Sequence, residues 1–336
     1  MNKSLNEQDH KFPFGTTIDY SGYPEFAERA HILFQPNYTL WDEIKSILRL
    51  LKAGRKEKVL LLDCASGHIH PDLLATVGMG FWPKSRRPII FFVGAMWQKD
   101  PGIRGIIQKV ILQLADRSIK GYIPLSTDEI PIFSRTWEIP ELKLHHCPYF
   151  FTFTQEDLKE PAPPRDAFVF SGGNTMRDYE PYLEAITSMP EHQFVIATKL
   201  LQGRKLPQNL QAKPVHRSEF IRLMRASSAV VVPMRKDLNR SAGQQTYLNA
   251  MMLGKITIVS NTFGVRDHVE DQKTALVVDG TPESYIRSLR WALDPANRAE
   301  VETIIRNAQQ VVTERFTFEN HAKCVLDTMD SLSQAS

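Results

Sequence analysis

The stretch SAGQQTYLNAMMLG, residues Ser241–Gly254, runs directly into KITIVS, residues Lys255–Ser260. Its first part is typical of a polar loop that leads into a helix, and Gly254 is a residue type that commonly ends helices. The second part is rich in β-branched residues, which indicates a buried strand. A glycine at a helix start lets backbone N–H groups approach an anion. The stretch therefore predicts either a phosphate-binding helix start beside a parallel sheet or an ordinary buried helix with a polar start.

The rest of the chain repeats this alternation of short apolar runs and helical patterns, which predicts parallel sheets covered on both faces. The runs at 59–62 and 229–232 carry no charge and are expected to be fully buried. The expected strands are 31–35, 59–64, 88–93, 121–124, 142–147, 167–171, 193–197, 229–233, 256–260 and 275–278, with a short β-like segment at 213–215. The expected helices are 41–51, 72–77, 103–115, 128–137, 176–189, 218–226, 244–253, 283–292, 299–313 and 317–332.

Length and the position of prolines divide the chain. A chain of 336 residues exceeds the usual size of one core, so two domains are expected. The stretch Tyr149–Arg165 combines prolines with charges and is typical of a linker. We expect a first domain at 1–150, a linker at 151–165, a second domain at 166–316 and a final helix at 317–336. The fold class predicted is α/β, with two Rossmann-like domains facing a central cleft where ligands bind at the carboxyl ends of strands.

Composition excludes several classes of protein. The net charge is only +3, and no basic tract is interleaved with stacking aromatics, so nucleic acid is not an expected partner. The three cysteines, Cys64, Cys147 and Cys324, show no metal-ligand spacing, and a disulfide framework is not expected. The first ten residues lack the apolar core of a signal peptide, and no apolar run has the length of a membrane span. These features favour a cytoplasmic protein.

The second half resembles the C-terminal domain of GT-B glycosyltransferases, in particular the retaining family-4 group. The resemblance rests on an ordered series over about residues 166–332: SGG at 171–173, RDY at 177–179, the strand ending at Pro233, the loop and helix at 243–254, and NTFGVRDHVEDQKTALVV at 261–278. In the first half only ADR at 115–117 and LSTDE at 125–129 match in outline, and no glycine-rich loop follows the first strand. The resemblance implies that the final helix crosses back to the first domain.

This sequence departs from that family at two signature glutamates. The aligned positions hold Ser241, near the donor sugar in the family, and Asn249, near the nucleotide ribose. Both side chains can hydrogen-bond hydroxyl groups, but neither carries a charge. The departure concerns the donor and the activity rather than the fold.

The expected chemistry is stabilisation of a diphosphate leaving group. The chain contains no Asp-x-Asp triplet, which favours stabilisation by cations and a helix start without a metal or other cofactor. Arg177 matches a phosphate-contacting lysine position of the family and is a candidate catalytic residue together with Ser241. The candidate donor-binding residues are Gly172, Gly173, Arg177, Lys199, Val215, Arg217, Gly243, Gln244, Gln245, Thr246 and Asn249. The ordinary alternatives are a solvated surface charge for Arg177 and turn geometry for Gly173, and Ser218, next to Arg217, is expected to cap a helix.

Candidate acceptor-site residues follow two strands of the first half. His68, in CASGHIHPD at 64–72, is a candidate for proton transfer, and His70 for binding acceptor hydroxyls. The two histidines are not expected to form a metal site, because no third metal ligand is evident near them in the sequence. Trp97 is a candidate for stacking on a sugar ring, or alternatively a core residue.

Two basic stretches indicate a possible location. In 44–58, Ile44, Ile47, Leu48 and Leu51 are expected to face the core, while six cations between Lys45 and Lys58 oppose one anion, Glu57. A second basic and aromatic stretch, FWPKSRR, lies at 81–87. Together they suggest peripheral contact with an anionic membrane, although a core-facing stripe with a solvated basic side explains the first stretch as well.

The function expected is transfer of a sugar from a UDP- or GDP-linked donor to a carbohydrate or lipid-linked acceptor, without metal and with retention. The alternatives are another GT-B enzyme, such as a nucleotide-sugar epimerase, and a catalytically silent nucleotide-sugar-binding protein.

Overall fold

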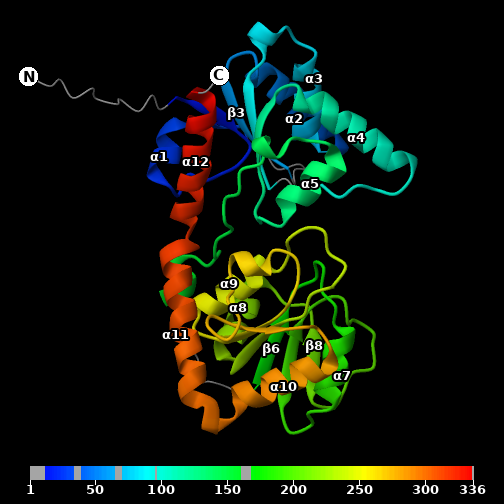
Figure 1. The fold of residues 1–336 in the computed structure, drawn as a ribbon, viewed down its shortest axis with the longest axis vertical. Helices are drawn as coiled ribbons and strands as arrows, with labels where there is room; N and C mark the ends of the chain where they lie inside the picture. Colours follow the sequence, from blue (N-terminus) through cyan, green and yellow to red (C-terminus); the bar gives the residue numbers. More distant parts are fainter. Residues whose placement is uncertain (1–11, 34–38, 65–69, 95–96, 160–167, 335–336) are drawn as a thin grey trace, which may run out of the picture. The chain divides into compact units, whose positions relative to one another are not determined.

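The computed structural model describes residues 12–33, 39–64, 70–94, 97–159 and 168–334. The chain divides into two compact units (Figure 1). Unit 1 comprises residues 1–147 with 321–336, and unit 2 comprises residues 148–320.

Unit 1 is built on a parallel sheet with strand order β2-β1-β3-β4-β5. The central strands β3 and β4 consist almost wholly of large apolar side chains, which explains why both faces of the sheet are covered. The strands are β1 (Phe14–Thr16), β2 (Ala30–Ile32), β3 (Val59–Asp63), β4 (Ile89–Val93) and β5 (Ile119–Ile123).

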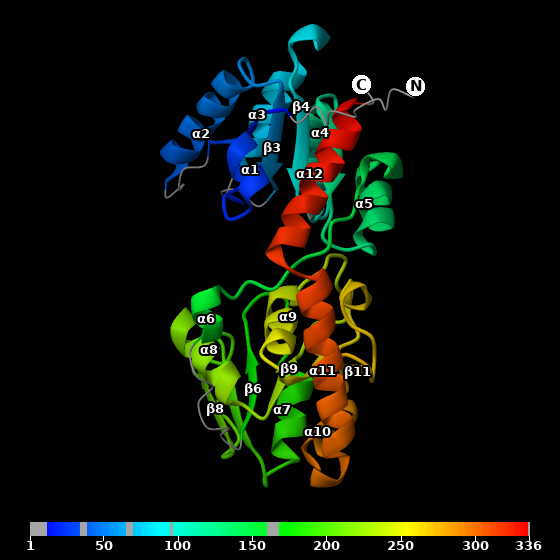
Figure 2. The ribbon, with the colours of Figure 1, turned by 90° about the vertical axis from the view of Figure 1, so that its left-hand side faces the viewer.

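One face of this sheet carries three adjacent helices, α2 (Leu40–Ala53), α3 (Pro71–Gly80) and α4 (Ile103–Asp116). The crossovers that contain them all run in the same direction along the sheet, and right-handed crossovers then place them on the same face. The β1-to-β2 crossover runs in the opposite direction and contains α1 (Pro24–Arg29), which lies beside α12 (Phe318–Gln334) (Figure 2). Helix α5 (Glu129–Trp137) and the 3₁₀ turns η1 (Lys84–Arg86) and η2 (Glu141–Lys143) complete the described helical segments of this unit.

Helix α12 is fixed to unit 1 by both polar and apolar contacts. Arg29 of α1 donates to Asp330 of α12 at 2.5 and 2.9 Å, and the Tyr20 hydroxyl lies 2.9 Å from Nε2 of His321. Residues Val325 and Met329 are fully buried. The last turns of the chain therefore belong to the core of the first unit.

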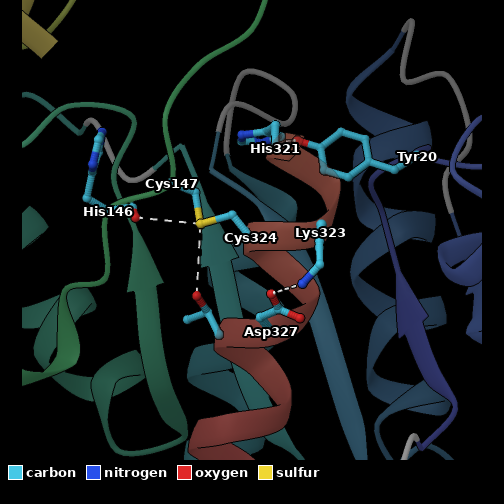
Figure 3. The surroundings of a disulfide bond; sticks show 8 residues. Tyr20, His146, Cys147, His321, Lys323, Cys324 and Asp327 are labelled. Carbon is cyan, nitrogen blue, oxygen red and sulfur yellow. Dashed lines mark hydrogen bonds and ion pairs between the residues drawn. A yellow bond between two sulfur atoms is a disulfide. The ribbon is translucent and has the colours of Figure 1, made fainter. Parts of the chain in front are cut away.

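A disulfide joins Cys147 to Cys324 across 177 residues of sequence (Figure 3). Cys147 follows the last segment of unit 1 before the chain enters unit 2, and Cys324 lies in α12 after the chain has returned. The expectation that the cysteines form no disulfide is therefore wrong. Sequence separation hid the pair, because only the return of α12 brings the two Cα atoms within 5.8 Å.

Unit 2 is built on a parallel sheet with strand order β11-β10-β9-β6-β7-β8. Its middle strand β9 reads AVVV and is completely buried, as the sequence predicts. The strands are β6 (Phe168–Gly172), β7 (Gln193–Ala197), β8 (Leu210–Lys213), β9 (Ala229–Val232), β10 (Ile256–Ser260) and β11 (Leu276–Val278).

Two apolar clusters cover the two faces of this sheet. Helices α7 (Glu180–Thr187) and α10 (Pro282–Leu293) share one cluster. Helices α8 (Arg217–Ala226) and α9 (Gln244–Met252) share the other, and α11 (Arg298–Arg315) contributes to both. The remaining segments are α6 (Gln155–Lys159), η3 (Val265–Asp267) and η4 (Pro295–Asn297). None of the helices described in either unit is long and apolar enough to cross a bilayer.

Some sequence expectations fail for local reasons. The expected strand at 142–147 is instead the turn η2 followed by a single bridge from Leu144 to Tyr122. The helix expected from Met176 begins at Glu180, because Met176 has a positive φ of 55° and Arg177 forms a bridge with Met234. Strand β1 and helix α1 were not predicted from the sequence, and Leu48 is exposed rather than directed into the core.

Candidate functional site

Arg177 lies at the carboxyl end of the unit 2 sheet, between β6, β9 and the start of α9. Its Nε donates to the Gly172 carbonyl at 3.1 Å, and Nη1 donates to the Thr175 carbonyl at 3.1 Å. Its Nη2 donates to the Thr246 hydroxyl in the first turn of α9 at 2.8 Å. Nη1 also donates to the Met234 sulfur after β9 at 2.8 Å, so three segments that are far apart in sequence meet at one guanidinium.

The charge of Arg177 is buried without an opposite charge. The residue is 8% exposed, and among the described residues no carboxylate forms an ion pair with it. Burial lowers the pKa of Arg177, but arginine remains protonated at any physiological pH. A buried cation whose neighbours are neutral is unfavourable unless an anion compensates it. The geometry therefore suits an anionic ligand.

Two glycines bring backbone close to this guanidinium. Gly173 has a φ of 114°, and a Cβ there would lie 2.7 Å from Nη2 of Arg177. Gly243 has a φ of 82°, and a Cβ there would lie 2.9 Å from the Met234 sulfur and 3.4 Å from Nη1 of Arg177. Both positions require glycine for conformation and for space.

Helix α9 begins beside the same guanidinium. Gly243 is its N-cap residue and, as a glycine, supplies no side-chain cap. The helix start contributes partial positive charge next to Arg177. The structure thus brings together Gly172, Gly173, Arg177, Gly243 and Thr246, five of the residues that the sequence singled out for phosphate binding, and Gln244 lies buried in the same turn.

A second loop, which contains Thr198 and Lys199, borders this group, and of its residues only Lys199 was predicted from the sequence. Asn174 accepts from the Lys199 backbone N–H at 2.7 Å, and Thr198 donates to the Gly173 carbonyl at 2.9 Å. The Lys199 side chain is exposed beyond the carboxyl end of β7. The polar run SGGN at 171–174 was the available signal for Asn174, since an amide after a glycine turn often fixes a neighbouring loop.

Two of the predicted donor contacts are used for internal bonds instead. Asn249 is buried, its Oδ1 accepts from the Thr152 N–H at 2.8 Å, and its Nδ2 donates to the Thr152 hydroxyl at 3.0 Å. Gln245 also donates to that hydroxyl at 2.8 Å. The ribose contact of Asn249 therefore stays a prediction that requires Thr152 to be displaced. Ser241 is 4% exposed in the loop before α9.

Arg217 and Val215 lie on the approach to α8. The guanidinium of Arg217 makes a two-pronged ion pair with Asp157 of α6, at 2.9 and 2.6 Å. This bond lowers the pKa of Asp157 to about 2. Val215 is half-buried after β8. The ion pair accounts for Arg217 without a ligand, and a contact with a nucleotide base stays a prediction for both residues.

The acceptor-site candidates of unit 1 lie in varied surroundings. His68 lies outside the described residues. His70 adopts a positive φ of 50° before α3, and its Nδ1 has no hydrogen-bond partner among the described residues. Trp97 packs edge-on against Phe92, and its indole N–H donates to the Cys64 carbonyl at 3.2 Å. Packing alone accounts for Trp97, so its contact with a sugar stays a prediction.

A buried acidic residue near His70 was not singled out by the sequence analysis. Asp72, 2% exposed in the first turn of α3, accepts from the Thr17 hydroxyl at 2.5 Å and from the Asp63 N–H at 3.2 Å. These bonds tie the carboxyl ends of β1 and β3 to the start of α3. Acidic residues in a first helical turn are common for electrostatic reasons, so the sequence offered no distinguishing signal.

Two α/β units with parallel sheets, one of them with glycine turns and a helix start around a buried cation, define the class: the fold is that of GT-B glycosyltransferases. Within unit 2, residues 199–311 match the family model described as Glycosyl transferases group 1. The chain resembles the GT-B glycosyltransferases of that group.

Solved structures agree with this fold. A glycosyltransferase from Rickettsia africae is 12% identical, with a TM-score of 0.66 over 97% of this chain and 91% of that chain. HepE of Anabaena in complex with UDP is 12% identical, with a TM-score of 0.68 over 94% and 91%. A putative UDP-N-acetylglucosamine 2-epimerase from Listeria monocytogenes is 11% identical, with a TM-score of 0.56 over 97% and 98%. Comparison with curated proteins finds no match.

Proposed function

We propose that this protein is a glycosyltransferase that moves a sugar from a UDP- or GDP-linked donor to a carbohydrate or lipid-linked acceptor. Unit 2 would bind the donor and unit 1 the acceptor. The bond between the sugar C1 and the diphosphate oxygen breaks, a bond from C1 to an acceptor oxygen forms, and the proton of the acceptor hydroxyl passes to the departing diphosphate. We further propose retention of configuration and no requirement for a metal ion.

The single observation that supports this proposal most strongly is the buried, carboxylate-free guanidinium of Arg177 beside the start of α9. Negative charge grows on the diphosphate as the C1–O bond breaks, and a fixed cation with a helix start stabilises that charge. The fold likeness to HepE, which was solved with UDP and with UDP-glucose, supports a nucleotide diphosphate as the anion. Ser241 would contact the sugar and Asn249 the ribose.

Calorimetric titration with UDP and GDP tests the donor site. We expect one nucleotide to bind the wild type, and Arg177→Gln to weaken binding by at least tenfold, because a charge-assisted contact contributes about 1.5–3 kcal/mol. Thr246→Val is the second variant, since it removes the hydroxyl that accepts from Arg177 and keeps the guanidinium. The matched control is Arg204→Gln, which removes an exposed guanidinium paired with Glu180 on the same unit. Equal binding by folded Arg177→Gln and wild type contradicts the proposed site.

A nucleotide-sugar epimerase is the second candidate, favoured by the fold likeness to the Listeria protein. Incubation with nucleotide sugars and analysis of the products by NMR separates the two activities. A transferase releases UDP or GDP and yields a glycosylated acceptor, whereas an epimerase inverts one carbon of the sugar without an acceptor. Tight binding of the nucleotide sugar with neither product identifies a binding protein.

A further inference from the structure

Helix α4 of unit 1 has apolar side chains on both of its sides. Leu112 and Ala115 are buried in the core of unit 1, and Gly105 is buried against the Asp100 carbonyl. On the other side Ile103, Ile106, Ile107 and Val110 are 74%, 61%, 53% and 50% exposed. Their spacing of three, four and seven residues places them in one continuous stripe. A helix that packs by one side only does not need this stripe for folding.

Helix α2 has a comparable stripe in which apolar and cationic side chains alternate. Trp41 and Leu48 are 68% and 62% exposed, and Lys45 and Lys52 lie between and beyond them. Lys45, Leu48 and Lys52 follow Trp41 by four, seven and eleven residues, so all four side chains share one side of the helix. Long lysine side chains lay their methylene groups along an apolar surface and keep the ammonium group in a polar environment.

Helix α3 lies between α2 and α4 and adds no exposed charged side chain to the layer. Its one charged residue, Asp72, is buried, and Phe81 at its end is 68% exposed. We call the exposed side of this three-helix layer the α2–α4 face. It comprises Trp41, Leu48, Phe81, Ile103, Ile106, Ile107 and Val110. Exposed apolar patches of this extent usually mark a site of interaction.

The positive charge of the chain is concentrated around the same layer. Residues 40–117 contain thirteen Lys and Arg but seven Asp and Glu, whereas the whole chain has a net charge of only +3. Of the seven acidic residues, Glu43 and Asp72 are buried, and Asp116 is bound by Lys143 at 2.8 Å. Lys45 pairs with Asp42 and Lys109 with Glu138, but the other cations of the segment still outnumber its acidic residues.

A cationic cavity adjoins the end of α2. A volume of about 900 Å³ opens beside the starts of β3 and β4, and Arg55, Lys56, Lys58, Arg86 and Arg87 line it together with Glu57. Arg55 lies 5.7 Å from the centre of the Trp82 ring. Among the described residues no carboxylate forms an ion pair with any of these five cations. The two basic stretches singled out in the sequence, which are 23 residues or more apart, meet in this cavity.

We propose that the α2–α4 face and this cavity dock unit 1 on an anionic lipid bilayer. Trp41, Phe81 and the isoleucine stripe of α4 enter the boundary between headgroups and acyl chains. The cations of the cavity bind lipid phosphates. A bilayer offers both an apolar layer and negative charge over a wide surface, which matches the combination seen here. A symmetric pair of chains would instead place the two cationic borders opposite each other.

Vesicle sedimentation tests this docking. Purified protein is mixed with vesicles of phosphatidylcholine alone and with vesicles that contain phosphatidylglycerol, at low and high salt. We expect the bound fraction to rise with phosphatidylglycerol content and to fall with salt, because each cation near an anionic surface contributes through screened electrostatics. Wild-type protein that stays in the supernatant with anionic vesicles at low salt overturns the proposal.

Two double variants separate the contribution of the cations to vesicle binding from that of the apolar side chains. Arg55→Gln with Arg86→Gln should lower partitioning onto anionic vesicles about thirtyfold. Ile106→Gln with Ile107→Gln should lower it at least tenfold, with no loss of stability because both side chains are exposed. The matched controls are Lys205→Gln with Arg290→Gln and Leu142→Gln with Leu200→Gln, which remove exposed residues outside the layer. Equal losses in variants and controls contradict the assignment to this face.

The same isoleucine variant distinguishes a second copy from a membrane. Sedimentation velocity without lipid measures the oligomeric state of wild type and variant. We expect no difference between them. A wild-type dimer that dissociates in Ile106→Gln with Ile107→Gln assigns the face to self-association and overturns membrane docking.

Discussion

Gly243 shows most directly how single residues fix the candidate donor site. Its positive φ turns the chain into α9, and its missing side chain leaves room for the Met234 sulfur and for Arg177. The spacing of glycines around a helix start predicted this role from the sequence. The hydrogen bonds of Arg177 to Met234 and Thr246 were not predictable, since they depend on segments that meet only in the folded unit.

We predict that Gly243→Ala weakens nucleotide binding far more than Gly203→Ala. Both glycines have a positive φ, 82° and 74°, so both variants lose about 1 kcal/mol of stability from backbone strain. Only at Gly243 does the new Cβ meet other atoms, whereas nothing lies within 4 Å of a Cβ at Gly203. Thermal unfolding and titration with UDP and GDP measure the two effects. Equal nucleotide binding by the two variants contradicts the steric argument.

Asn249 gives a second prediction at the scale of a residue. Asn249→Ala should destabilise the protein by about 1–3 kcal/mol, because it leaves the Thr152 N–H without its acceptor. Denaturant unfolding measures this loss. If the folded variant binds nucleotide as the wild type does, Asn249 acts by positioning Thr152. Loss of binding beyond the loss expected from unfolding supports contact with the ribose.

At the scale of elements, the sequence predicted the sheets better than the connections. The strands β3, β4, β7, β9 and β10 lie within one or two residues of their expected positions, because short apolar runs with almost no charge favour a buried strand. The short elements β1 and α1 were missed, since three to six residues carry too little periodicity. Helix α2 was expected, but its buried side was not: Glu43 and Ser46 are buried while Leu48 is exposed.

The contact between α6 and α8 leads to a pH-dependent prediction. Arg217 lowers the pKa of Asp157 to about 2, below the value of about 4 for an unfolded chain. The ion pair therefore stabilises the folded state above pH ~4, and this stabilisation is lost as the pH falls towards 2. We expect wild type to melt above Asp157→Asn at neutral pH, and the difference to shrink between pH ~4 and ~2. Melting curves over this range measure it, and a constant difference contradicts the role of the pair.

At the scale of the whole molecule, the return of the chain to unit 1 was implied by family resemblance but not by any pattern in the residues. Buried residues of helix α12 belong to the core of unit 1, and Arg29 forms a hydrogen bond with Asp330, which lies 301 residues further along the sequence. Such contacts leave no local signal. The Cys147–Cys324 disulfide follows from the same return and was not expected.

We predict that the disulfide stabilises unit 1. Reduction of the oxidised wild type should lower its stability by about 2–5 kcal/mol, because the bond restricts a loop of 177 residues in the unfolded chain. Unfolding with and without reductant, followed by near-ultraviolet circular dichroism, measures the change. The control is Cys147→Ser with Cys324→Ser, in which reductant should have no effect. Titration of three free thiols in the oxidised wild type shows that the bond does not form.

The amino-acid sequence by itself determined that the chain folds as two layered α/β units. It also determined that one of these units contains a helix that begins at a glycine. Periodicity, β-branched runs and glycine positions are local properties, and they act on neighbouring residues whatever the rest of the chain does. Only the tertiary structure decided that Arg177 is buried without a carboxylate, that Asn249 holds Thr152, that Cys147 meets Cys324, and that the isoleucines of α4 remain exposed. Each of these depends on which distant segments occupy the same space, and a residue's own neighbours in sequence do not specify that.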